Sequence, residues 1–363
     1  MTKRLHFPKI IVQLTAFALL VSACGGGSGG GPPGGGNNPP PSSEWLIPQG
    51  EVIDGGPGPD GIPSIDSPNF DSITENEPAD PGELVIGMLV DGVAKAYPHE
   101  IMDWHEIVND GTDTAPYTMS YCPLTGSALA WEGNPADSNS DFGVSGLLYN
   151  SNLILYDRAT ASLWPQMLDQ SVNGPRIREV PTRMQIIETS WGTWRAMYPD
   201  SLILNTTTGH IRDYGQYPYG EYKTNSGLLF PVKNSDQRLH PKERVLGIRE
   251  GAQVKVYQIE GFGPATMAIN EQFGSTQIVV VGNSASNFGA IYDRTLSDGT
   301  ILNFTAIDGQ LPNVLQDDEG NVWDIFGTAV SGPRTGEQLG LTNSYIAMWF
   351  AWVAFFPDTA IHF

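Results

Sequence analysis

The segment from Val85 to Trp131 carries the side chains of this sequence that are best suited to chemistry. Cys122 lies in the run MSYCPLTG, and His99 and His105 precede it in AYPHEIMDWHEIVND. A thiol and an imidazole occur together in nucleophilic enzymes and in sites for soft metal ions. These three side chains are therefore the first candidates for a functional site.

Three interpretations of Cys122 are compatible with the sequence. Free cysteine is among the most buried residue types, so Cys122 can be an ordinary apolar core residue. It can instead bind copper or zinc with His105 and His99, although no standard metal motif has the spacing of these two histidines. Third, Cys122 can be a catalytic nucleophile or redox centre, with His105 as the base and Glu106 or Asp103 orienting the imidazole.

A second group of polar residues could form a ligand-binding site if folding brings it close to the thiol. Its members are Tyr121, Asp157, Arg158, Arg212 and Asp213. Arginine and aspartate often neutralise each other on burial, so a structural role is the alternative. If the group converges on Cys122, it predicts a pocket for a small polar or anionic ligand. The sequence contains none of GxxxxGK[ST], GxSxG, HExxH or CxxCH, so no such motif identifies a reaction.

The beginning of the chain has the features of an export signal. MTKRLHFPK is basic, and IIVQLTAFALLV after it is too short to span a bilayer comfortably. Small residues precede Cys24 in VSAC, which resembles a lipobox, so residues 1–23 are a predicted signal peptide and Cys24 a predicted lipidation site. Residues 24–43 are rich in Gly and Pro and predict a flexible tether. We expect a membrane partner through the lipid and a location in the cell envelope, at the outer membrane or the cell surface.

The overall composition narrows the classes of partner and fold. The chain has 40 acidic and 19 basic side chains and a formal net charge of −21, which opposes binding to nucleic acid. It contains 42 Gly and 28 Pro with nine Trp and thirteen Tyr, which favours many short strands and turns over long helices. If Cys24 is lipidated, Cys122 has no intramolecular disulfide partner.

Comparison of the chain with itself indicates a duplication. WGTWRAMYPDSLI, beginning at Trp191, aligns without a gap to WFAWVAFFPDTAI, beginning at Trp349. Likewise, ELVIGMLVDGVAKAYP from Glu83 resembles ERVLGIREGAQVKVYQ from Glu243. The predicted fold is therefore a β-rich α+β fold of two related domains, each a repeat of short strands with one short helix. The repeats are residues 44–204 and 242–363, with a connecting region at 205–241.

The short helices can be predicted in more detail. The first is expected at Trp191–Tyr198, with Thr189 or Ser190 as its N-cap and Pro199 ending it. Its counterpart, IAMWFAWVAFF, is apolar on all sides but only eleven residues long, which favours a buried helix over a membrane span.

The second repeat lacks the reactive side chains of the first. Cys122 aligns with Asn283, and the region that matches His99 and His105 falls at residues 259–265, which contain no histidine. The positions shared by the repeats are mostly apolar, Gly or Pro, as a common fold requires. Any activity is therefore predicted to lie in the first repeat.

Several longer blocks resemble a known family. They include GGPGPDGIPSIDSPNF, AYPHEIMDWHEIVND, YCPLTGSALAW, FGVSGLLYNSNLILYDRATASLWPQ, TGHIRDYGQYPYGEY and KERVLGI. Together they resemble the domain-of-unknown-function family 3179, over roughly Gly55 to Gly251. Members of this family often have CPLC where this chain has CPLT, so Thr125 removes the second thiol of a dithiol mechanism. The resemblance implies no activity.

These observations leave three hypotheses for function. The first is an envelope protein that binds a small ligand or a metal near Cys122 and His105. The second is an enzyme that uses Cys122 as a nucleophile or redox centre. The third is a purely structural surface lipoprotein.

Overall fold

The computed structural model describes residues 44–73, 80–133 and 141–362, and its described part is rich in β-strands. The predicted signal peptide, the predicted tether and Cys24 lie outside the described residues. The described residues begin at Glu44, which is also where the first predicted repeat begins. Within the described ranges, the α-helices are α1 (His99–His105), α2 (Trp191–Met197) and α3 (Trp349–Phe355). None of the helices described is long and apolar enough to cross a membrane.

The first part of the chain builds three antiparallel or mixed sheets. The first has the order β12-β3-β4-β13-β2, from β12 (Ile187–Ser190), β3 (Leu84–Val90), β4 (Val93–Pro98), β13 (Leu202–Leu204) and β2 (Phe70–Ser72). The second has the order β11-β7-β6-β5, from β11 (Arg183–Met184), β7 (Ser127–Glu132), β6 (Ala115–Cys122) and β5 (Ile107–Thr112). The third has the order β1-β8-β9-β10, from β1 (Val52–Asp54), β8 (Phe142–Tyr149), β9 (Asn152–Asp157) and β10 (Leu163–Pro165).

The last part of the chain builds three further sheets. The first is β24-β14-β15-β25, from β24 (Ser344–Met348), β14 (Arg244–Glu250), β15 (Gln253–Gln258) and β25 (Ala360–Ile361). The second is β16-β17-β18-β23, from β16 (Met267–Phe273), β17 (Thr276–Asn283), β18 (Phe288–Asp293) and β23 (Gly340–Leu341). The third is β19-β20-β21-β22, from β19 (Phe304–Ala306), β20 (Asn313–Asp317), β21 (Val322–Asp324) and β22 (Ala329–Ser331). Single 3₁₀ turns lie at η1 (Gln49–Glu51), η2 (Gln166–Leu168) and η3 (Glu260–Phe262).

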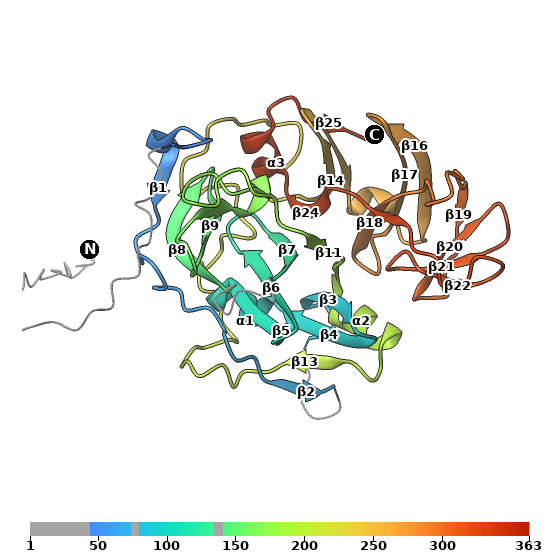
Figure 1. Cartoon of the computed structure of the whole chain (residues 1–363), viewed down its shortest axis with the longest axis horizontal. Coiled ribbons are helices and arrows are strands. Elements are labelled where there is room, and N and C mark those ends of the chain that lie inside the picture. The colour runs from blue at the N-terminus through green and yellow to red at the C-terminus, as the bar shows by residue number, and fades with distance from the viewer. Residues whose placement is uncertain (1–43, 74–79, 134–140, 363) are drawn as a thin grey trace, which may run out of the picture. The chain divides into compact units, whose positions relative to one another are not determined.

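Two sheets of the first part have the same strand order as two sheets of the last part. The order β12-β3-β4-β13 corresponds to β24-β14-β15-β25, and in both the final pair, β13 with β4 and β25 with β15, is parallel. The order β5-β6-β7-β11 corresponds in the same way to β16-β17-β18-β23. Figure 1 shows the sheets of the first part in blue to yellow-green and those of the last part in gold to red.

A glycine opposite a tryptophan ring recurs in the corresponding β3 and β14 strands. A Cβ on Gly87 would lie 2.0 Å from the Trp194 ring, and one on Gly247 would lie 2.2 Å from the Trp352 ring. No side chain larger than hydrogen fits at either position, because a Cβ atom and a ring carbon in contact are at least 3.0 Å apart. The glycines therefore allow α2 and α3 to pack directly onto their sheets.

Two hydrophobic cores are shared between the two parts of the chain. The core around Cys122 and Leu153 also contains Trp349 and Trp352 of α3. Conversely, Trp194 of α2 packs in a core with residues of the last part, such as Trp323. Each helix thus completes a core that is otherwise built mainly by the other part. Further cores, such as those around Tyr121 and around Phe262, belong to one part alone.

The local predictions agree with the structure to different degrees. Helix α2 begins after Ser190, whose side chain accepts a hydrogen bond from Thr193, as predicted for an N-cap. Helix α3 is shorter than predicted, because Ser344–Met348 pairs with β14 as strand β24. Helix α1 was not predicted, so the described residues of the first part form two short helices instead of one.

Candidate functional site

Cys122 lies at the end of β6 and faces the apolar core. Its side chain is fully buried, the Leu153 amide donates to its sulfur at 3.4 Å, and its sulfur lies 3.8 Å from the Ser151 carbonyl oxygen. Burial, with a smaller contribution from the nearby Glu106 carboxyl, raises the pKa of the Cys122 thiol to about 11. The thiol is therefore protonated at neutral pH and is not a resting nucleophile.

His105 is held by partners other than the thiol. Its Nδ1 lies 2.7 Å from the Pro63 carbonyl oxygen, which can only accept, so Nδ1 carries the proton. Its Nε2 then accepts from the Tyr214 hydroxyl at 2.7 Å, and this hydroxyl is also bonded to Thr208. Burial lowers the pKa of His105 to about 4. Neither ring nitrogen is free to take a proton from Cys122, so the predicted thiol–imidazole pair does not form in this structure.

His99 and Tyr121 lie on the opposite side of β6 from Cys122. Successive side chains of a strand point to opposite faces, so Tyr121 packs in a different core from Cys122. The rings of His99 and Tyr121 are 4.3 Å apart, and His99 Nε2 lies 3.1 Å from Glu188. Within the described ranges, no three His, Cys, Asp or Glu side chains are placed to hold a metal ion. The predicted copper or zinc set of His99, His105 and Cys122 is therefore not assembled here.

Asp157 and Arg158 serve separate structural contacts. The Asp157 carboxylate is fully buried and accepts from Trp164 Nε1 at 3.0 Å. Arg158 instead binds Asp66 at 2.7 Å and lies 3.5 Å from Asp60, which fastens the loop before β2 to the end of β9. These contacts agree with the structural alternative for the pair and do not converge on Cys122.

Arg212 and Asp213 line a polar pocket close to α1. Its other walls include Asp103, Trp104 and Tyr219. Arg212 lies over the Trp104 ring at 5.9 Å from its centroid. The pocket shares Tyr219 and Ile62 with a second, apolar pocket, so two of the five predicted ligand-binding residues lie next to the site described below.

The apolar pocket encloses about 280 Å³, near the lower end of small-molecule sites, which begin at roughly 300 Å³. Its walls are mostly aliphatic and include Ile62, Leu124, Val144, Leu147, Leu148 and Leu153. The ionisable side chains that line it are Glu106 and Tyr219. Cys122 lies directly behind this wall, because Leu153 donates to its sulfur.

The pocket forms because β8 and β9 separate locally. Their pairing shifts register between Val144 and Leu148, which leaves a bulge in β8. The segment from Gly55 lies across this bulge, and the Gly55 amide donates to the Gly146 carbonyl at 2.8 Å. Gly146 has φ +77°, and a Cβ there would lie 2.7 Å from the Gly58 backbone, so only glycine permits the two segments to approach. The glycine-containing segments 55–61 and 142–146 thus build one pocket wall.

Glu106 is the unusual group in this pocket. It ends α1 with φ +59°, and only 4% of it is exposed. The Tyr219 hydroxyl donates to its Oε1 over a long 3.4 Å. Burial, with a smaller contribution from the nearby Asp103 carboxyl, raises the pKa of Glu106 to about 8. At neutral pH the Glu106 carboxyl is therefore protonated in most molecules, so it can donate a hydrogen bond.

The pocket residues Glu106 and Tyr219 were not among the predicted ligand-binding residues. The sequence suggested Glu106 only as an orienting partner of His105, and no pattern linked it to Tyr219 more than a hundred residues later. One signal was available in the sequence HEIV. Glu106 directly precedes the apolar start of β5, at a place where a strand that enters the core usually has an apolar residue.

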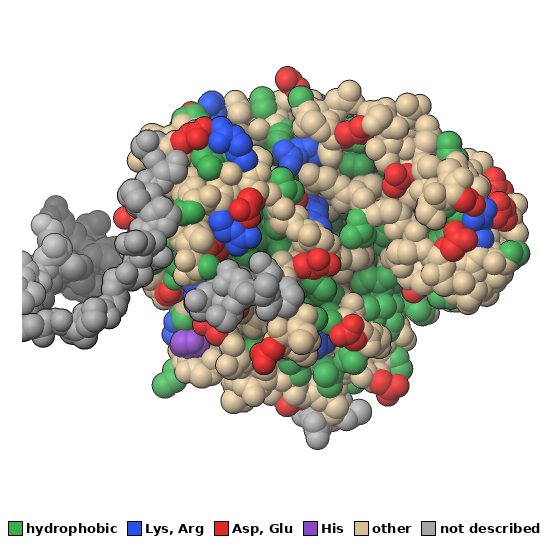
Figure 2. All heavy atoms as spheres, viewed as in Figure 1, with side chains coloured by type: hydrophobic (Ala, Val, Ile, Leu, Met, Phe, Trp, Pro, Cys, Tyr) green, Lys and Arg blue, Asp and Glu red, His purple; other side chains and the backbone are tan. Residues whose placement is uncertain are grey.

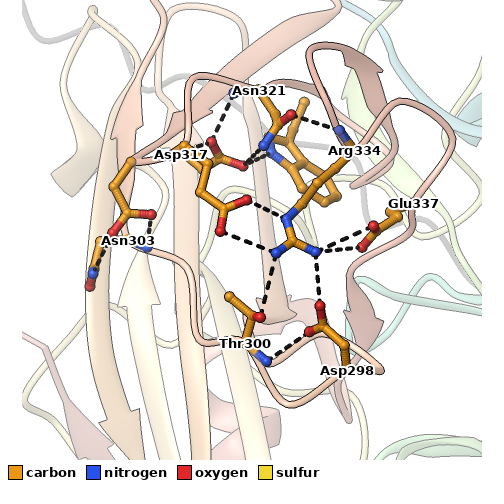
Figure 3. Close-up of polar contacts among 10 residues, drawn as sticks. Asp298, Thr300, Asn303, Asp317, Asn321, Arg334 and Glu337 are labelled. Carbon is orange, nitrogen blue, oxygen red and sulfur yellow. Dashed lines mark hydrogen bonds and ion pairs between the residues drawn. The ribbon is translucent and has the colours of Figure 1, made fainter.

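A charged cluster around Arg334, far along the chain from the apolar pocket, is structural. At the end of the molecule formed by β19–β22, acidic side chains surround a basic one (Figure 2). Figure 3 shows Arg334 directed at Asp298 and Glu337, at 3.2 and 3.3 Å, and Arg334 also pairs with Glu319. The Arg334 guanidinium lies at the centre of the acidic group and neutralises part of its charge. It therefore occupies the place that a bound cation would take.

The comparison with known families identifies one match. Residues 59–359 match the sequence model of a family described as a protein of unknown function, DUF3179. No curated protein and no solved structure matches this chain.

Proposed function

The chain belongs to the DUF3179 family, and from this premise we propose that it binds a small, largely apolar molecule in the pocket that Glu106 and Tyr219 line. The observation that carries this proposal is the burial of the Glu106 carboxyl in an aliphatic pocket with one long hydrogen bond. Burying a carboxyl with so few hydrogen bonds costs free energy, and an apolar side chain would pack there without this cost. A ligand that forms hydrogen bonds with Glu106 would explain why a carboxyl is placed there. The buried Cys122 thiol, with its raised pKa, supports binding over thiol catalysis.

The proposed binding protein is anchored in the cell envelope. This part of the proposal depends on the basic start, the apolar run and the lipobox-like VSAC before the glycines. Metabolic labelling of the expressing cells with a fatty acid tests it. Label on the wild-type chain and none on Cys24→Ala is expected, and equal labelling of the two would contradict the anchor.

We also propose that the chain is an internal duplication whose first copy holds the pocket. The matching strand orders and the paired glycine–tryptophan contacts of Gly87 with Trp194 and Gly247 with Trp352 support it. In the second copy, the positions that correspond to Glu106 and Cys122 are Met267 and Asn283, so that copy has neither the carboxyl nor the thiol at these places. One ligand per chain is therefore expected.

Titration of the purified protein with N-phenyl-1-naphthylamine tests the binding function. This neutral apolar dye fluoresces on leaving water, and saturable binding of one dye per chain is expected. Leu147→Trp fills the pocket and is expected to weaken binding at least tenfold, whereas Val330→Trp, at an exposed position of β22, is not. Thermal unfolding curves check that both variants fold. No saturable binding, or equal binding by folded Leu147→Trp, would contradict the proposal.

A further inference from the structure

The ligand of the Glu106 pocket can be specified further, given the proposed binding function. The pocket offers aliphatic walls to most of a ligand and two polar side chains at one place, Glu106 and Tyr219. A molecule that fills it must therefore have an apolar body with its polar group at one position. The chemistry of that group follows from what the two side chains can donate or accept.

Both side chains can donate a hydrogen bond in the protonation states that the site favours. The Tyr219 phenol lies beside Glu106, and its pKa is raised by burial, with Glu106 and Cys122 raising it further. The Glu106 carboxyl keeps its proton at neutral pH because burial raises its pKa to about 8. Asp103 of α1 is bound by Lys223 at 2.8 Å, and its charge disfavours a second negative charge on Glu106.

The bond between the two side chains is too long to satisfy them fully. At 3.4 Å, the Tyr219 hydroxyl is near the limit of a hydrogen bond to Glu106 Oε1. A ligand oxygen placed between them would accept from both groups at shorter distances. A phenol and a protonated carboxyl in an apolar pocket form a known type of site for a carbonyl oxygen.

We infer that the pocket selects an apolar molecule with a carbonyl-type oxygen, which accepts hydrogen bonds from Glu106 and Tyr219. An apolar amine is the competing class, since a cation would pair with an ionised Glu106. The two classes differ in their response to the charge of this side chain. The carbonyl needs a donor at position 106, whereas the amine needs a negative charge there.

Three naphthalene probes distinguish the classes by calorimetry with the full chain. These are 2-acetylnaphthalene, 2-ethylnaphthalene, which has nearly the same shape without the oxygen, and 2-naphthylmethylamine. We expect the ketone to bind about tenfold more tightly than the hydrocarbon, as one or two net hydrogen bonds would give. Its affinity should fall as the pH rises through about 8, where Glu106 ionises.

Two variants of Glu106 make the test specific. Glu106→Gln keeps a donor without a charge and should retain the preference for the ketone. Glu106→Leu removes the donor and should reduce ketone binding to that of the hydrocarbon. If the wild type bound the ketone and the hydrocarbon equally, the inference would be overturned but the proposed function would not. The same holds if the amine bound most tightly and Glu106→Gln lost that binding. Failure of all three probes to bind would instead overturn the proposed function.

Discussion

The same strand position has opposite environments in the two parts of the chain. The hairpins β5–β6 and β16–β17 each turn through two residues, and counting back from these turns places Met267 where Glu106 lies. Glu106 is 4% exposed and lines the apolar pocket, whereas Met267 is 43% exposed. A carboxyl is thus buried and a thioether is exposed, the reverse of what solvation alone favours. The pocket, and not the strand, explains the glutamate.

The thiol position differs in a similar way. By the same count, Asn283 lies where Cys122 does. Its amide donates to the Pro264 carbonyl at 3.1 Å and to Thr266 at 3.3 Å, so its polar atoms are satisfied within the loop. In the first part, the corresponding place holds a thiol against apolar side chains. The second part therefore satisfies an amide with hydrogen bonds at the position where the first part buries a thiol.

Other polar contacts are the same in both parts. Lys95 and Tyr97 of β4 bind Asp110 of β5 at 2.8 and 2.6 Å. The corresponding residues of β15, Lys255 and Tyr257, bind Glu271 of β16. A buried aspartate also binds a tryptophan in each part, in the pairs Asp157–Trp164 and Asp317–Trp323. The contacts that the two parts share join strands. The positions that differ are Glu106, which lines the pocket, and Cys122, which lies directly behind its wall.

The largest effect is expected from the paired tryptophans. Trp194→Ala and Trp352→Ala should each lower the free energy of unfolding by about 3–5 kcal/mol, because both rings are fully buried against a glycine. Urea unfolding of both variants measures this. A cost below about 1 kcal/mol for one of them would break the correspondence, because it would show that only one helix is needed for the core.

A pH-dependent effect is expected from Glu106. Its raised pKa means that the folded state keeps a proton that the unfolded chain loses above about 4.5. The favourable contribution is complete below that pH and is lost as the pH rises toward about 8. Glu106→Gln should therefore gain stability relative to the wild type over this range, by up to about 1.4 kcal/mol per pH unit.

The matched control for this prediction is Met267→Gln. This variant places the same amide at the exposed position of β16, where no titration is coupled to folding. Its stability relative to the wild type should not change between pH 5 and pH 8. A constant difference for Glu106→Gln as well would show that Glu106 ionises at its ordinary pKa in the folded state.

The sequence predicted the elements of this fold better than the site. Alternation and β-branched residues located strands such as β6, and Ser190 located the start of α2, because these signals are local. The Glu106 pocket depends on a bulge at Val144–Leu148 and on Tyr219, which belong to separate segments. Only their packing in three dimensions creates it. Cys122 and His105 drew attention by residue type, but type does not reveal which partner occupies each atom.

A smaller effect on stability is expected from Cys122. Cys122→Ala removes one buried sulfur from a full core and should cost about 1 kcal/mol. The native thiol should react with Ellman's reagent at pH 8 only after unfolding, because it is buried and its pKa is about 11. Complete reaction of the folded protein within minutes would restore the interpretation of Cys122 as an accessible nucleophile.

The smallest effect is expected at Met267, and it sharpens the comparison most directly. Met267→Glu gives the second part the residue that the first part has at this position. Because Met267 is 43% exposed, the new carboxylate stays in water, and the free energy of unfolding should change by less than about 0.5 kcal/mol at pH 7. Urea unfolding at pH 5 and pH 8 measures it, with Glu106→Gln as the counterpart in the pocket. If Met267→Glu showed the pH dependence expected for Glu106, the raised pKa would belong to the strand position itself. In that case the pocket would no longer explain why a carboxyl is buried in the first part.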